Sequence, residues 1–361
     1  MRTILAIVLM LPLFILPAYA EQAPDEGFRQ LEEELPDEAR EISGSLKLDG
    51  GYDGEAALAR LWSGLRDKLA EEVKGERREI FRVAGIALLG TLSAALCPDR
   101  RTEGYIRITV CAFAALMLAG GFDNMFVRTV GAMDQLSDYS RAAMPAVFTA
   151  AAACGAAVSA PARYGAVCLA LDVMMRESKQ WILPLIRAFL AVSIAAGIYE
   201  NSILRAISAL LKKTVFFLMT GTTALFTAYI GLTGIVTAST DAAAVKTTKT
   251  VISSVLPVVG NILSDAAGAV LSAASVIKNA AGVFALIAIS ALCIGPFAML
   301  GVKLLLFRLS AAAANMLPGS GLGSLLEQMS TVMSMLLGLL GCHAVMLFFS
   351  LMSAIRVVAP C

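Results

Sequence analysis

Histidine and charge are both scarce in this chain. The sequence contains one histidine, His343, and only 16% of its 361 residues are charged, whereas 58% are hydrophobic. A metal site with several histidine ligands is therefore excluded, and a Ser-His-Asp triad could use only His343. Soluble domains carry about 25% charged residues. The composition predicts an integral membrane protein, and we expect no enzymatic activity and no cofactor.

The cysteines and glycines offer no recognisable ligand-binding motif. None of the seven cysteines lies in residues 21–79, and no two have C-x-x-C spacing, so neither a disulfide framework nor a zinc site is expected. The glycine-rich stretch from Gly319 to Ser324 lacks the lysine of a P-loop. Basic residues are scattered singly around apolar blocks, which is not typical of nucleic-acid binding.

Charge is distributed unevenly along the chain. Residues 1–20 combine a basic start, an apolar core and a small-x-small pattern ending at Ala20, which predicts a signal peptide. Residues 21–79 contain 17 acidic and 9 basic side chains, whereas residues 80–361 contain 11 acidic and 19 basic ones. We expect an acidic exported helical region over residues 21–79, followed by a polytopic membrane domain over residues 80–361.

One amphipathic helix is predicted inside the exported region, from Asp53 to Glu79, because Asp53 is a suitable N-cap. Its apolar side chains recur at three- and four-residue spacing and form what we call the docking stripe: Leu58, Leu61, Trp62, Leu65 and Leu69. A single helix cannot bury such a stripe by itself. The acidic character of the region favours a protein partner over anionic lipid.

Eight hydrophobic blocks predict membrane spans, because about 20 helical residues cross a bilayer core. They lie near residues 80–97, 105–122, 142–161, 164–175, 181–199, 214–237, 281–306 and 331–358. The fold expected is therefore an all-α, polytopic membrane protein. The positive-inside rule then predicts that the polar residues 123–141 form an exterior loop. Counting the membrane crossings in the same way puts residues 238–282 on the exterior side, if the short block 164–175 crosses the membrane.

Residues 238–280 form an amphipathic segment with a regular polar seam. Two rows of small or polar residues repeat at intervals of seven, which marks one face of a helix. We call these residues the seam: Ser254, Asn261, Asp265, Gly268, Ser272, Ser275 and Asn279. Pro257 removes a backbone donor, so we expect the helix to break near residues 256–261.

Two interpretations of the seam remain open. Small residues commonly line packing surfaces between membrane helices, so the seam can be a groove for another helix. Alternatively it forms the wall of a polar pathway, with Asp265 as its one ionisable group.

Charged residues inside the other apolar blocks also need partners or water. We expect Asp172 to pair with Arg187, and His343 to make a hydrogen bond between helices. Such charges favour a stand-alone carrier or permease as an alternative function. No inverted repeat relates the two halves of the sequence, which counts mildly against a carrier.

The segment around the seam carries a specific run of motifs: Lys246-Thr247-Thr248-Lys249, Pro257-Val258-Val259-Gly260, Leu263-Ser264-Asp265-Ala266 and Ile277-Lys278-Asn279-Ala280. Together with the signal peptide and the exported helix, this run resembles the stage III sporulation protein AE family of endospore-forming bacteria. The resemblance extends from about Leu58 to Val358.

The resemblance implies a non-enzymatic membrane component of a sporulation channel or secretion complex. That complex would connect the mother cell to the engulfed forespore, in the mother-cell membrane facing the forespore. Its implied partners are other membrane subunits of the complex, a separate cytoplasmic ATPase subunit and the lipid bilayer. The family supplies no catalytic residues to carry over.

Overall fold

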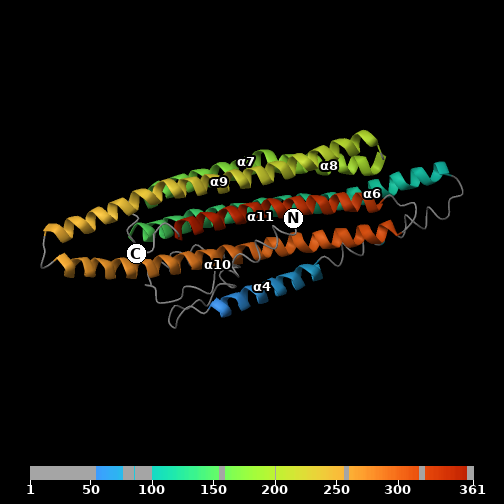
Figure 1. Cartoon of the computed structure of the whole chain (residues 1–361). Coiled ribbons are helices and arrows are strands. Elements are labelled where there is room, and N and C mark those ends of the chain that lie inside the picture. The colour runs from blue at the N-terminus through green and yellow to red at the C-terminus, as the bar shows by residue number, and fades with distance from the viewer. Residues whose placement is uncertain are drawn as a thin grey trace.

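Long, nearly parallel helices build the molecule, as a computed structural model shows (Figure 1). The structure describes residues 54–75, 85, 100–153, 159–199, 201–255, 260–316 and 322–355. The elements in this part are α4 (Gly54–Gly75), α6 (Arg100–Ala153), α7 (Ser159–Glu177), the π-helical η3 (Ser178–Ile182), α8 (Leu183–Tyr199), α9 (Ser202–Val255), α10 (Gly260–Asn315) and α11 (Leu322–Ile355). All of them are helical, in agreement with the all-α expectation.

The central element is α11, which packs against α6, α8, α9 and α10 (Figure 1). Every residue from Val332 to Phe348 is buried. The sequence explains this position, because α11 is apolar on all sides and has Glu327 as its only charged residue. A helix that is hydrophobic all round is buried on all sides.

Five helical stretches of the described residues are long and apolar enough to cross a membrane: Gly104–Thr149, Ala160–Tyr199, Ser202–Thr233, Ala285–Asn315 and Leu322–Ser353. This finding agrees with a multi-pass membrane protein. The block near 80–97 lies outside the described residues apart from Gly85, and so do residues 1–20 with the expected signal peptide.

The expected loop over residues 123–141 is instead part of one continuous helix, α6, which also contains the blocks 105–122 and 142–161 up to Ala153. The expectation of a loop was wrong because polar residues there occupy one side of a helix. Met133, Leu136 and Tyr139 on the other side are buried in the core. The segment is therefore an amphipathic part of a long helix.

The blocks 164–175 and 181–199 also belong to a single rod, formed by α7, η3 and α8. At the end of η3 the Leu183 N–H donates to the Ser178 carbonyl oxygen, five residues earlier. Pro184 follows at once and has no N–H to donate. A π turn accommodates such a missing bond, so the rod continues where the polar sequence suggested a loop.

The seam lies on two different long helices. α9 ends at Val255 and α10 begins at Gly260, so helix ends stand on both sides of Pro257, as expected; residues 256–259 lie outside the described residues. Figure 1 shows this end of α9 and α10 reaching beyond the ends of α6 and α11. The seam segment is thus the tip of a projecting helical hairpin.

Candidate functional site

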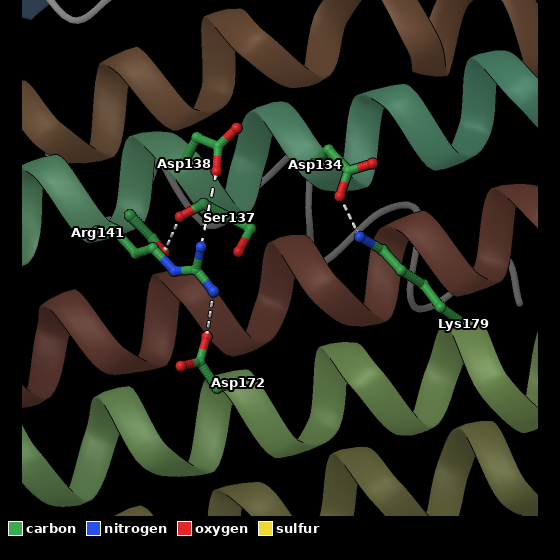
Figure 2. Close-up of polar contacts among 7 residues, drawn as sticks. Asp134, Ser137, Asp138, Arg141, Asp172 and Lys179 are labelled. Carbon is green, nitrogen blue, oxygen red and sulfur yellow. Dashed lines mark hydrogen bonds and ion pairs between the residues drawn. The ribbon is translucent and has the colours of Figure 1, made fainter.

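A cluster of charged side chains joins α6 to the α7–η3 rod (Figure 2). We call it the charged flank and define it by Asp134, Asp138 and Arg141 on α6, Asp172 on α7 and Lys179 on η3. Arg141 Nη2 donates to Asp172 Oδ1 at 2.7 Å, and Arg141 Nη1 lies 3.9 Å from Asp138 Oδ1. Lys179 Nζ donates to Asp134 Oδ1.

The two inter-helix pairs of the charged flank are spaced by seven residues on both helices. Asp134 and Arg141 stand two turns apart on α6, and so do Asp172 and Lys179 on the antiparallel rod. The order of charges is opposite on the two helices, so each acidic group meets a basic one. The pairs therefore favour one register of α6 against α7 and η3.

The charged side chains of the flank remain accessible from outside the bundle. The Asp138 side chain is 77% exposed, that of Arg141 63% and that of Asp172 51%. An exposed ion pair contributes at most about 1 kcal/mol in water. The flank is therefore an open surface rather than a buried structural salt bridge.

Charge reversal tests the Arg141–Asp172 contact. Asp172→Arg places two guanidinium groups together and should lower the unfolding midpoint of the detergent-purified protein by a few degrees, as a loss of about 1 kcal/mol implies. Adding Arg141→Asp should restore most of the loss, although not all of it, because the new carboxylate stands near Asp138. Arg141→Asp alone is measured as well. If the loss of stability in the double variant equalled the sum of the losses in the two single variants, the two residues would not interact.

Arg187 does not pair with Asp172, contrary to expectation. The two residues lie 15 positions apart on one continuous rod, which separates them by about 22 Å at ~1.5 Å per residue. Arg187 instead places its guanidinium carbon 5.1 Å from the ring centre of Phe126 on α6, a cation–π contact. The prediction failed because it assumed a hairpin between two short spans.

His343 lies in the middle of the most buried helix and is 1% exposed. Its Nδ1 is 2.7 Å from the Leu339 carbonyl oxygen, one turn earlier on α11, so the bond found is within one helix rather than between helices. Among the described residues, its Nε2 and the Tyr139 hydroxyl are buried without a hydrogen-bond partner. Nucleophilic or acid–base chemistry would need further groups beside His343, and the described residues supply no constellation of that kind.

The docking stripe is divided between the inside and the outside of the protein. α4 lies along α10 (Figure 1), with Leu61 buried in the core and Leu65 packed against it. Leu69 is half-buried, and the side chain of Leu58 lies outside the described part. Trp62, in contrast, is 65% exposed. The chain itself covers the inner part of the stripe, and Trp62 remains available for a partner.

The seam residues are placed only by their helices. Ser254 belongs to the last turn of α9, whereas the other six seam residues belong to the first half of α10. Their side chains lie outside the described part. The choice between a packing groove and a polar pathway thus remains a prediction.

No group of three or more His, Cys, Asp or Glu side chains arranged to hold a metal ion occurs in the described ranges. The four cysteines described, Cys111, Cys168, Cys293 and Cys342, form no disulfide with one another, and three of them are buried. The charged flank is therefore the main polar arrangement that the described residues form.

A family model described as Stage III sporulation protein AE matches residues 49–358 of this chain. The chain belongs to the stage III sporulation protein AE family. The match includes α4, the whole helix bundle, the charged flank and the seam. The resemblance noted in the sequence is thereby confirmed, and the name of the family indicates a role in sporulation.

A relative described as "Stage III sporulation protein AE", from Bacillus subtilis (strain 168), is 24% identical over 222 residues. These residues cover 61% of this chain and 55% of the relative, so the match spans little more than half of the relative's length. No solved structure matches the chain.

Sequence reasoning missed Asp134, Asp138, Arg141 and Lys179 as members of a site. The signal was present, because Asp134, Asp138 and Arg141 have the i, i+4, i+7 spacing of one helix face. It was overlooked because residues 123–141 were expected to form a loop.

Proposed function

We propose that the chain is a non-enzymatic subunit of a sporulation channel complex that connects the mother cell with the engulfed forespore. It would lie in the mother-cell membrane that faces the forespore, with residues 21–79 outside the cytoplasm. Its partners would be other membrane subunits and a separate cytoplasmic ATPase subunit. The match to the family over residues 49–358 is the observation that carries this proposal.

The length of the helices supports a protein that extends beyond the bilayer. α9 has 54 residues and α10 has 56, which makes each about 80 Å long at ~1.5 Å per residue. A bilayer core is about 30 Å thick. Much of each helix must therefore lie outside the hydrocarbon, where it can reach other subunits across an intermembrane space.

Affinity isolation tests the proposal against the alternative of a stand-alone carrier. A tagged full-length chain would be isolated in mild detergent from sporulating cells of the endospore-forming host. We expect constant amounts of other membrane subunits and of the ATPase in the isolate. A chain that purifies alone, and that moves solutes when reconstituted into vesicles, would contradict the proposal and favour the carrier.

The exposed part of the docking stripe gives a narrower prediction. Trp62→Ser should reduce recovery of partner subunits by at least tenfold, because buried tryptophans at interfaces commonly contribute about 2 kcal/mol or more. Asp67→Ser, a change on the same helix at a side chain that is 72% exposed and lies on a different face from Trp62, is the matched control and should leave recovery unchanged. Equal recovery with both variants would show that the outer surface of α4 is not a docking surface.

A further inference from the structure

One cross-section of the bundle contains both the charged flank and an apolar outer surface. Ser193 on α8 and Ser208 on α9 share a hydrogen bond at 2.9 Å. α8 and α9 run antiparallel, so residues that are equally far from this bond, before Ser193 and after Ser208, lie at the same level. Lys179 precedes Ser193 by 14 residues and Thr222 follows Ser208 by 14, so Lys179 is level with about Thr222. The charged flank therefore lies at the same height as the middle of α9.

A contact through the centre of the bundle relates α11 to the same part of α9. The Cys342 thiol on α11 lies 3.9 Å from the Met219 carbonyl oxygen on α9. Met219 on α9 and Cys342 on α11 thus stand at one level of the bundle.

At this level α9 presents an outer surface suited to lipid. Its residues from Thr214 to Thr240 include no charged side chain, and this stretch exceeds the roughly 20 residues that cross a bilayer core. Phe217 is 76% exposed, Leu225 62% and Leu232 65%.

The opposite requirement holds for the charged flank and its surroundings. Carboxylates, guanidinium and ammonium groups that stay exposed are strongly unfavourable in hydrocarbon, even as pairs. α4, with exposed Arg66, Asp67 and Glu71, lies along the middle of α10 (Figure 1) and adds further charge beside the bundle. Water can satisfy these charged side chains, whereas lipid satisfies the apolar outer surface of α9. α6 and α7 also expose apolar side chains, such as Val127 and Leu169.

We infer that the charged flank of α6 and α7 lines a water-filled space at the same depth at which the outer surface of α9 contacts the hydrocarbon of the bilayer. One side of the bundle, the outer surface of α9, would thus face lipid, and the charged flank would face water at the same depth in the membrane. The role of this surface as part of the wall of a conduit rests on the proposed function. The hydration of the flank follows from the placement of its charges (Figure 2).

Cysteine labelling in native membranes of sporulating cells tests the inference. The flank reporters are Gln135→Cys and Asp138→Cys, because Gln135 is exposed beside the ion pairs and Asp138 is the most exposed flank carboxylate. The matched controls at the same level are Phe217→Cys and Leu225→Cys. A charged thiol reagent and a lipid-soluble one are applied, and peptide mass spectrometry separates each reporter from the native cysteines.

We expect the charged reagent to modify the two flank reporters at least tenfold faster than the two α9 reporters, and the lipid-soluble reagent to reverse this order. Slow labelling of all four positions by the charged reagent would overturn the inference, because the flank would then be covered. Fast labelling of all four would also overturn it, because that level would lie outside the bilayer. Partner recovery from the same membranes is scored separately, so failure of the channel proposal remains distinguishable from failure of the hydrated flank.

Discussion

Replacing Leu336 and Leu340 of α11 with alanine should sharply destabilise the protein and reduce the yield of heat-resistant spores. Both leucines have 0% exposure in the centre of the bundle. Removal of a buried leucine side chain leaves a cavity and costs about 2–5 kcal/mol. Packing is the main source of helix association in a membrane, so lipid outside the bundle cannot offset this loss.

The matched control is Leu225→Ala with Leu232→Ala on α9, where both side chains are mostly exposed. This pair removes the same number of atoms and should leave the unfolding midpoint in detergent nearly unchanged. The measurement is thermal unfolding of each purified full-length variant, together with spore counts. Equal shifts for the two pairs would contradict the central position of α11.

The seam gives the second large effect, with opposite outcomes for its two interpretations. Asp265→Asn removes a charge and keeps the shape, whereas Gly268→Leu keeps neutrality and fills the small-residue row. If the seam is a packing groove, Gly268→Leu should prevent assembly and Asp265→Asn should be nearly silent. If it lines a polar pathway, Asp265→Asn should block sporulation while the complex still forms.

Spore counts and recovery of partner subunits together decide between these outcomes. The projecting position of the α9–α10 hairpin makes its tip accessible to other subunits (Figure 1), which favours an effect on assembly. Normal assembly and normal sporulation in both variants would eliminate both interpretations of the seam.

The helical class and the family could be predicted from the sequence because both depend on long stretches of the chain. Apolar composition over hundreds of residues specifies a membrane protein, and the motif run from Lys246 to Ala280 specifies the family. The all-round apolar character of α11 likewise indicates a central helix. These signals do not depend on where any one helix ends.

The boundaries of helices and the partners of charged residues were harder to predict. Hydropathy interprets a polar stretch as a loop, yet residues 123–141 continue α6 because their apolar side chains share one face. The same error at residues 176–180 hid η3, and with it the pairing of Lys179 with Asp134. Asp172 was therefore matched with Arg187 on its own rod, whereas its true partner, Arg141, lies on a neighbouring helix.

The docking stripe shows a second limit of prediction from sequence, which concerns the partner of an apolar helix face. Periodicity correctly places Leu61, Trp62 and Leu65 on an amphipathic helix, but it does not say what covers them. α10 of the same chain contacts α4 and covers Leu61, while Trp62 points outward. Contacts between segments more than 180 residues apart in the sequence cannot be predicted from the pattern of one helix.

Passage of a small molecule from the mother cell into the engulfed forespore tests the proposed role most directly. A membrane-impermeant fluorescent tracer would be confined to the mother cell, and its entry into the forespore followed in cells with and without this chain. The channel proposal predicts that deletion abolishes entry and that the full-length chain restores it. Undiminished entry in the deletion strain, with spore formation nevertheless lost, would contradict the account.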